Sequence, residues 1–223
     1  MKKKDVGVIT IGQSPRTDMT EDMVSILGDR FNIIEKGALD DFDIDYVRKN
    51  LYPDSKDTVL VSRMRNGEEV KLSEEKILPL VQQCIYNLEN MGCSLIALLC
   101  TGEFPELNHK NILIYPEKIV HHIVEILNED KVLGIIVPDE KQIKETEIYF
   151  NKRNIKTKIK AASPYLDING LNNICSEFNE DISIIFMNCM GFSSKMKSIV
   201  SENTGKLVIL PRNIIFSLIN QLA

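Results

Sequence analysis

The chain has 223 residues, of which 43% are hydrophobic and 26% are charged, an ordinary balance for a folded globular protein. At roughly 150 residues per domain, this length corresponds to one large or two small domains. The 27 basic and 32 acidic residues give a formal net charge of −5, which argues against a function built on contacts to a phosphate backbone. We therefore expect no nucleic-acid partner.

The apolar stretches of the chain are too short to cross a membrane. The longest, such as Leu95–Cys100 and Val132–Pro138, fall far below the ~20 residues that a spanning helix needs. Near the amino terminus the apolar run Val6–Ile11 breaks at Gly12-Gln13-Ser14-Pro15, so the basic first residues are not followed by the core of a signal peptide. These features predict a cytoplasmic protein without a membrane partner.

Short aliphatic runs alternate with amphipathic segments, which predicts an α/β fold. Runs rich in Val, Ile and Leu predict buried strands of mainly parallel sheets, at Val6–Ile11, Phe31–Ile34, Leu95–Cys100, Val132–Val137, Ile182–Asn188 and Leu207–Leu210. Apolar residues at helical spacing predict helices on both faces of these sheets, at Thr17–Leu27, Ser73–Met91, Glu117–Leu127, Glu140–Phe150, Leu171–Phe178 and Pro211–Leu222.

One segment of the first half has the pattern of a β-hairpin insertion. Thr58–Met64 and Glu68–Leu72 both alternate polar and apolar residues, and Asn66-Gly67 between them favours a type I′ turn. Arg63 and Arg65 share one face of this hairpin. That face is interpreted as exposed to solvent, with contact to an anionic ligand as the alternative.

The five cysteines show neither a Cys-x-x-Cys pair nor the spacing of a metal site, so we expect reduced thiols and no metal. Cys84 and Cys175 lie on apolar helix faces and Cys93 begins a strand, which indicates core positions. Cys100 and Cys189 differ because each ends a buried strand just before a glycine. Ligands of open α/β sheets bind at such carboxyl ends, so these two are either core residues or candidate reactive thiols.

The segment Gly12–Arg16 is a second candidate site. A strand that enters a polar Gly/Ser loop and then a helix, here with Thr17 or Asp18 as its cap, is typical of an anion site. Arg16 supplies a side chain suited to a carboxylate. The alternative is a capped helix start with a surface arginine. A serine hydrolase elbow is disfavoured because Arg16 occupies the position of its second glycine.

The adjacent histidines indicate a structural role. His121 and His122 are adjacent on a predicted helix and therefore face different directions, so they are interpreted as surface residues and not as ligands.

Each half of the chain opens with a strand that ends at a proline-containing loop and later holds a strand that ends in cysteine and glycine. This similarity suggests two related lobes.

Three motifs together resemble the AroM family: Ile11-Gly12-Gln13-Ser14-Pro15-Arg16, Cys100-Thr101-Gly102-Glu103-Phe104 and Asn188-Cys189-Met190-Gly191-Phe192. The resemblance extends over the hairpin, Ile136-Val137-Pro138 and Pro211-Arg212-Asn213. AroM proteins are similar to distant members of the aspartate/glutamate racemase superfamily, which implies two pseudo-symmetric lobes with a cleft between them. The implied lobes are residues 1–107, with 208–223 returning to them, and residues 108–207.

The resemblance also implies residue roles and an assembly. Cys100 matches the first-lobe cysteine of the superfamily and Cys189 the second, so that the two face a small carboxylate from opposite sides. The Gly12–Arg16 loop matches the position that binds the substrate carboxylate. Relatives often form dimers, which implies a homodimer here.

Two departures affect the expected substrate. The amino-acid racemases usually follow the first cysteine with Asn-Thr, where this chain has Thr101-Gly102. They tend to carry Thr and then His or Glu beside the second cysteine, where this chain has Met190-Gly191-Phe192. Aspartate and glutamate are therefore not the substrates that these motifs specify.

The leading hypothesis is a cofactor-independent isomerase of the racemase or epimerase type, in which Cys100 and Cys189 transfer protons to and from a small carboxylate. Amides of the glycine-containing loops would stabilise the charge that develops. The candidate substrate-binding residues are Gly12, Gln13, Ser14, Arg16, Thr101, Gly102, Asn188, Met190 and Gly191. The alternatives are a decarboxylase or cis–trans isomerase of the same fold that uses one cysteine, and a non-catalytic protein that binds or senses a small carboxylate.

Overall fold

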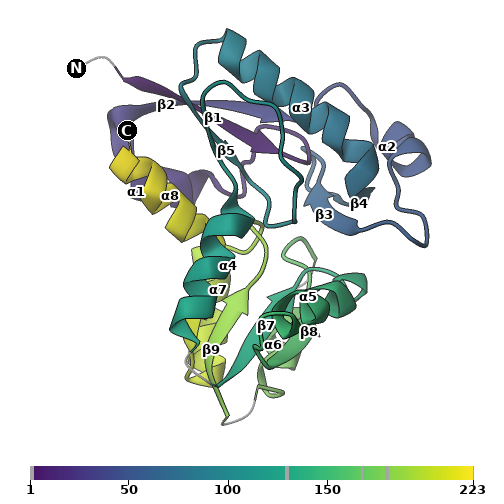
Figure 1. Ribbon diagram of the computed structural model, residues 1–223, viewed down its shortest axis with the longest axis vertical. Helices are drawn as coiled ribbons and strands as arrows, with labels where there is room; N and C mark the ends of the chain where they lie inside the picture. Colours follow the sequence, from purple (N-terminus) through teal and green to yellow (C-terminus); the bar gives the residue numbers. More distant parts are fainter. Residues whose placement is uncertain (1–2, 129–130, 167, 179–180, 223) are drawn as a thin grey trace. The chain divides into compact units, whose positions relative to one another are not determined.

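In the computed structural model of the protein, residues 3–128, 131–166, 168–178 and 181–222 are described. The chain divides into two compact units, unit 1 with Met1–Glu117 and Asn213–Ala223, and unit 2 with Lys118–Arg212. Each unit contains one parallel four-stranded sheet with flanking helices, which confirms the predicted fold class (Figure 1). The strand Ile112–Ile114 pairs within the sheet of unit 1, and the strand Leu207–Ile209 pairs within the sheet of unit 2.

The sheet of unit 1 has the strand order β2-β1-β5-β6. Its strands are β1 (Lys4–Thr10), β2 (Phe31–Gly37), β5 (Leu95–Leu98) and β6 (Ile112–Ile114). The helices that begin in this part of the chain or return to it are α1 (Thr20–Leu27), α2 (Ile44–Asn50), α3 (Glu74–Asn90) and α8 (Pro211–Leu222). Apolar side chains of β1, β5 and α3, including Ile9, Ile77 and Leu98, meet in a buried core.

The sheet of unit 2 has the strand order β10-β9-β7-β8. Its strands are β7 (Val132–Val137), β8 (Thr157–Ala161), β9 (Ile182–Met187) and β10 (Leu207–Ile209). Its helices are α4 (Pro116–Leu127), α5 (Lys141–Asn151), α6 (Asn169–Cys175) and α7 (Ser194–Thr204). The sequence pattern did not predict β6, β8, α2 or α7.

The two sheets have the same topology. Reading unit 2 in the order β8-β7-β9-β10 reproduces the order β2-β1-β5-β6 of unit 1, and all of these neighbouring strands are parallel. The internal similarity that the sequence suggested therefore corresponds to a repeated βαβ arrangement. Because the carboxyl ends of parallel strands share one edge of a sheet, the loop after β5 corresponds to the loop after β9.

The hairpin of β3 (Val59–Arg63) and β4 (Glu69–Ser73) is antiparallel as predicted, but its turn is not type I′. The Gly67 N–H donates to the Met64 carbonyl at 3.0 Å, and the Met64 N–H donates to the Glu68 carbonyl at 2.8 Å. Only Gly67 of this loop has a positive φ, at 96°. A three-residue loop that ends in a glycine of this conformation fits the observed contacts better than the two-residue loop that Asn-Gly pairs favour.

The hairpin packs against the loop after β1, and Gly12 makes that contact possible. A Cβ atom on Gly12 would lie 2.4 Å from the Arg63 carbonyl oxygen and 2.4 Å from the Ser62 hydroxyl oxygen. The neighbouring Gln13 N–H donates to the same Arg63 carbonyl at 3.1 Å. Figure 1 shows the hairpin beside α2 and α3 in unit 1. Because Gly12 has no side chain, the backbone of the hairpin at Arg63 can approach the loop after β1 closely.

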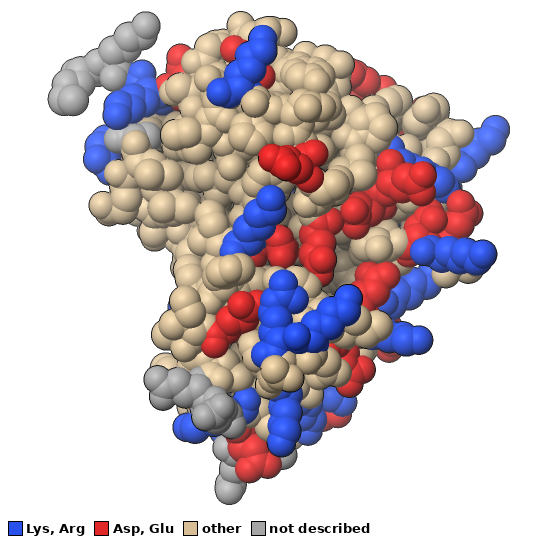
Figure 2. Space-filling view, viewed as in Figure 1, with Lys and Arg blue, Asp and Glu red and all other residues tan. Residues whose placement is uncertain are grey.

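None of the helices in the described part of the chain combines the length and apolar character that crossing a bilayer requires. On the face drawn in Figure 2, acidic and basic side chains are interspersed.

We expect Gly12→Ala to lower the free energy of unfolding by about 1–3 kcal/mol, because overpacking against backbone atoms displaces the hairpin. Gly170→Ala is the matched control, since a Cβ there meets no atom within 4 Å. Chemical denaturation followed by circular dichroism measures both variants. Equal loss of stability in the two variants would contradict the packing role of Gly12.

Candidate functional site

The loop after β1 is tied internally to the segment that follows β2. The Gln13 side-chain amide donates to the carbonyls of Leu39 at 3.1 Å and Phe42 at 2.9 Å. The Ser14 backbone N–H and hydroxyl both donate to the Asp40 carboxylate, each at 2.7 Å. These polar groups of Gln13 and Ser14, which sequence analysis assigned to substrate binding, thus hold the loop itself in place.

Arg16 is buried, with a relative exposure of 2%, and its guanidinium has partners on three nitrogen atoms. Nε donates to Asp18 Oδ1 at 2.9 Å, and Nη2 donates to Asp18 Oδ2 at 2.7 Å. Nη1 donates to the Thr10 hydroxyl at 2.9 Å. Asp18 therefore neutralises Arg16 and does not cap α1, which begins at Thr20 without a side-chain cap. The expected surface arginine is a buried ion pair.

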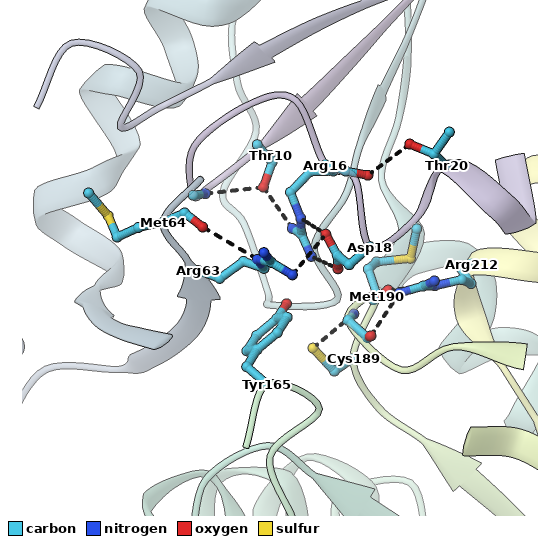
Figure 3. Close-up of polar contacts among 12 residues, drawn as sticks. Thr10, Arg16, Asp18, Thr20, Arg63, Met64, Tyr165, Cys189, Met190 and Arg212 are labelled. Carbon is cyan, nitrogen blue, oxygen red and sulfur yellow. Dashed lines mark hydrogen bonds and ion pairs between the residues drawn. The ribbon is translucent and has the colours of Figure 1, made fainter. Parts of the chain in front are cut away.

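A second arginine shares this carboxylate, as Figure 3 shows. Arg63 Nη1 lies 3.8 Å from Asp18 Oδ1, and the Arg63 side chain retains 19% exposure. Its Nε donates to the Met64 carbonyl at 3.3 Å. Two guanidinium groups therefore share one carboxylate, and the Glu35 carboxylate accepts from the Arg16 backbone N–H at 2.7 Å. The sequence pattern predicted that the hairpin face with Arg63 is exposed to solvent, with contact to an anionic ligand as the alternative. In the structure most of the Arg63 side chain is buried.

Cys100 follows β5 and accepts a hydrogen bond through its sulfur. The Gly102 N–H donates to Cys100 Sγ at 3.4 Å, and the cysteine is partly exposed. A Cβ on Gly102 would lie 2.6 Å from a methyl carbon of Leu60 in β3, so this glycine also accommodates the hairpin. Thr101 between them is buried.

Cys189 follows β9 and has the same local geometry in unit 2. The Gly191 N–H donates to Cys189 Sγ at 3.3 Å. A Cβ on Gly191 would lie 2.4 Å from the Tyr165 hydroxyl oxygen, so Gly191 leaves room for that side chain. The cysteine itself is 8% exposed. In both units, the loop after the strand therefore directs a glycine N–H at the cysteine sulfur.

The two cysteines occupy equivalent positions in the repeated topology. In unit 1 the last residue of β5 that pairs with the central strand β1 is Leu98. In unit 2 the last residue of β9 that pairs with the central strand β7 is Met187. Cys100 and Cys189 each lie two residues further along the chain. The match in register supports the assignment of corresponding roles that the sequence motifs suggested.

A buried arginine holds the loop after Cys189 (Figure 3). Arg212 has a relative exposure of 0%, and its Nε donates to the Met190 carbonyl at 2.9 Å. Its Nη2 donates to the Gly191 carbonyl at 2.7 Å. The Pro211-Arg212-Asn213 motif contributed to the family resemblance, but nothing in its residue types indicated that the arginine would bind this loop.

Asn188 contacts His121, which the sequence pattern predicted to lie at the surface. His121 is 3% exposed and packs against Tyr149, Phe150 and Phe186. Its Nε2 lies 3.3 Å from Asn188 Oδ1. The surface interpretation of His121 was wrong because the aromatic residues of α5 and β9 enclose the face of α4 that carries it.

The other three cysteines lie in apolar surroundings. Burial raises the pKa of the Cys84 thiol to about 12, and the nearby Asp40 acts in the same direction. Burial also raises the pKa values of Cys93 and Cys175. The Cys175 thiol donates to the Leu171 carbonyl at 3.2 Å, which requires the protonated form. These three cysteines are core residues, in agreement with the sequence interpretation.

The contacts define what chemistry each unit can support. An amide N–H directed at sulfur favours a thiolate over a thiol, which is the form that removes protons or attacks carbon. Of the two arginines near Asp18, Arg63 is the one that keeps some exposure, so its guanidinium is the group that could meet an anion. Within the described residues, no group of three or more His, Cys, Asp or Glu side chains is arranged to hold a metal ion.

Comparison with known proteins identifies both the family and the fold. Residues 6–223 match the AroM protein family. The structure is similar to an aspartate racemase from Picrophilus torridus, with a TM-score of 0.66, 15% identity and coverage of 98% of this chain and 94% of that one. No curated protein sequence matches the chain.

Two further solved structures share the fold. A maleate cis–trans isomerase from Nocardia farcinica, solved with TRIS bound, has a TM-score of 0.65 at 9% identity, with coverage of 98% of this chain and 91% of that one. An arylmalonate decarboxylase has a TM-score of 0.55 at 12% identity, with the same coverage. The predicted fold is thus confirmed, and this chain shares it with an aspartate racemase, a maleate cis–trans isomerase and an arylmalonate decarboxylase.

We expect alkylation of the folded protein at neutral pH to modify Cys100 and Cys189 and to leave Cys84, Cys93 and Cys175 unmodified. The three core thiols have raised pKa values, so they stay protonated and unreactive. Peptide mass spectrometry after brief iodoacetamide treatment measures the five sites, and denatured protein serves as the control in which all five react. Labelling of a core cysteine before either strand-end cysteine would contradict this assignment.

Proposed function

The chain belongs to the AroM family, and we propose that it is a cofactor-independent isomerase of the racemase or epimerase type. Its substrate is a small carboxylate with an acidic α-hydrogen. Cys100 and Cys189 exchange protons with the α-carbon from opposite faces. The protein acts in the cytoplasm and needs neither a membrane nor a nucleic acid for this reaction.

One observation carries the proposal. Two cysteines stand at register-equivalent strand ends in a duplicated topology, and each receives the N–H of the glycine two residues later at 3.3–3.4 Å. The contact closes the loop after each strand, and it also directs an amide at the sulfur, from which a proton-transferring thiol gains because the amide stabilises the thiolate. The occurrence of the same contact in both units supports a pair of thiols that act on one ligand.

The proton transfer balances without a cofactor. One thiolate takes the α-proton, so that an S–H bond forms while the C–H electron pair passes into the substrate carboxylate. The opposite thiol then gives its proton to the other face of the α-carbon and becomes the thiolate. The configuration inverts, and the two sulfurs exchange protonation states. Amide donors and the positive charge of unit 1 stabilise the enolate-like intermediate.

Arg63 is the group that supports carboxylate binding best. Arg16 already has two hydrogen bonds to Asp18 and one to Thr10, so its charge is compensated. Arg63 approaches Asp18 only at 3.8 Å and keeps some exposure. We therefore assign to Arg63 the contact with the substrate carboxylate, and to Arg16, Gln13 and Ser14 the support of the loop beneath it.

We expect single Cys100→Ser and Cys189→Ser variants to abolish racemisation, because two-sided proton transfer needs both thiols. Small α-substituted carboxylates are incubated in D₂O with each protein, and α-deuterium incorporation and inversion are followed by NMR and chiral chromatography. Cys84→Ser is the matched control and should retain the full rate, because Cys84 lies in the core with a pKa of about 12.

The same variants separate the alternative activities. The likeness to a maleate cis–trans isomerase and an arylmalonate decarboxylase supports a one-cysteine reaction as the second candidate. Activity on a maleate-like or malonate-like substrate that survives loss of Cys100 and not of Cys189 would replace the two-cysteine proposal. Carboxylate binding without exchange or turnover in the wild-type protein would leave a binding or sensor function.

We expect Arg63→Met to raise the substrate concentration for half-maximal exchange by about tenfold or more, because a charge-assisted hydrogen bond contributes about 1.5–3 kcal/mol. The probe is the carboxylate that exchanges fastest with the wild-type protein. Arg48→Met is the control, since Arg48 is 60% exposed and pairs with Glu68. Equal effects of the two substitutions would remove Arg63 from the binding site.

A further inference from the structure

The helices that follow β6 and β10 occupy equivalent positions in the repeated topology. In both cases a proline two residues after the strand begins a helix of 12 residues, which is α4 after β6 and α8 after β10. Most of α4 belongs to unit 2, and most of α8 belongs to unit 1. The sixth residue is His121 in α4 and Phe216 in α8, and both are buried. Unit 2 therefore has a histidine where unit 1 has an apolar aromatic residue.

The residue before each strand-end cysteine is also equivalent in the two units. It is Leu99 in unit 1 and Asn188 in unit 2. The Leu99 N–H donates to the Ile9 carbonyl of the central strand at 2.7 Å, and the Asn188 N–H donates to the Ile136 carbonyl of the corresponding strand at 2.8 Å. Unit 1 thus has two apolar residues at the positions where unit 2 has a histidine and an asparagine. The repeated fold accepts apolar side chains at both positions.

The two polar side chains of unit 2 contact each other. His121 Nε2 lies 3.3 Å from Asn188 Oδ1. An amide oxygen only accepts hydrogen bonds, so Nε2 is the donor, in the neutral ring with the proton on Nε2 and in the protonated ring alike. Burying polar groups costs free energy that apolar side chains do not require. Polar residues at positions where the same fold accepts apolar ones are therefore candidates for a functional role.

The contact with His121 orients the Asn188 amide. Because Oδ1 faces the histidine, Nδ2 lies on the other side of the same planar group. Asn188 is partly exposed, and Nδ2 makes no hydrogen bond within the part of the chain that the structure describes. Nδ2 carries two N–H groups and cannot accept a hydrogen bond. A ligand group that binds there must be an acceptor such as a hydroxyl or carboxylate oxygen, because an ammonium group has donors only.

We propose that Asn188 is a specificity-determining residue that donates from Nδ2 to an oxygen of the substrate, and that His121 is the positioning residue that directs this donor. The inference rests on the proposed function, in which Arg63 binds the carboxylate and the neighbouring Cys189 acts at the α-carbon. The group left for Asn188 is then the α-substituent. The substrate class is a small carboxylate with a hydroxyl or second carboxylate on the α-carbon, and not an α-amino acid.

The test uses probes that differ in the α-substituent. Lactate, methylmalonate and alanine share a methyl group and a carboxylate and carry a hydroxyl, a carboxylate or an ammonium group as the third substituent. Malate and aspartate form a second pair. Nuclear magnetic resonance measures the dissociation constant of each probe and the rate of α-deuterium incorporation in D₂O. We expect the wild-type protein to bind the probes with an oxygen substituent about tenfold or more tightly than their amino counterparts, because an ammonium group cannot pair with Nδ2.

The variants take the residues that unit 1 carries. Asn188→Leu should weaken binding of lactate and methylmalonate by about 3- to 10-fold, the loss of one hydrogen bond, and leave alanine unaffected. His121→Phe keeps an aromatic ring among Tyr149, Phe150 and Phe186 but removes the donor, so it should weaken binding of the same probes. The double variant should bind no more weakly than Asn188→Leu alone, because His121 acts through Asn188.

Two further variants separate positioning from packing. His121→Gln keeps an N–H donor and loses the ring, so it should bind the oxygen-bearing probes more tightly than His121→Phe while melting at a lower temperature. A role in packing alone predicts the reverse order of binding. His122→Phe is the matched control, since His122 is the adjacent exposed histidine, and it should match the wild-type protein.

Tighter binding of alanine than of lactate and methylmalonate, or of aspartate than of malate, would overturn the inference. Additive effects of His121→Phe and Asn188→Leu would overturn the positioning role of His121. Exchange of the amino-acid probes that requires both Cys100 and Cys189 would refute the inference and leave the proposed function standing. Selective binding of the oxygen-bearing probes without exchange would refute the proposed isomerisation and leave the specificity of Asn188 standing. Binding of none of these probes would overturn the inference.

Discussion

The hydrogen bond from a glycine N–H to a cysteine sulfur sets the geometry of both candidate half-sites. It closes the chain into a tight loop immediately after a buried strand, at Cys100 and Gly102 in one unit and at Cys189 and Gly191 in the other. Glycine is required because a side chain would collide with Leu60 in the first case and with Tyr165 in the second. A single local contact therefore fixes the sulfur, directs an amide at it and determines which neighbouring elements can pack over the loop.

The two buried arginines both hold the shape of a loop that follows a strand. Arg16 forms an ion pair with Asp18 and donates to the Thr10 hydroxyl, which fixes the loop after β1. Arg212 donates to the carbonyl oxygens of Met190 and Gly191, which fixes the loop after β9. A buried charge is costly unless it is paired or hydrogen-bonded. These contacts therefore explain why each arginine can occupy the interior.

The sequence predicted the parts of the fold that are buried and apolar. β7 was predicted with its observed bounds because Val132–Val137 is an apolar run in which Gly134 is the one residue without an aliphatic side chain. β8 escaped notice because its alternating lysines resemble a solvated segment, and every residue of this strand is only partly buried. β6 is short and its first residue, Ile112, is exposed. Strand ends marked by cysteine and glycine identified the candidate thiols, but the partners of Arg16 and the burial of His121 depend on contacts between distant segments.

The repeated topology explains why the two thiols occupy matched positions. Each cysteine stands two residues beyond the last residue of its strand that pairs with the central strand, Leu98 in unit 1 and Met187 in unit 2. The proposed two-base proton transfer needs one base and one acid at the start. Two equivalent thiols that act on one ligand meet this need, because ionisation of the first disfavours ionisation of the second. Duplication of one α/β unit therefore suffices, in the proposed reaction, to supply both the base and the acid.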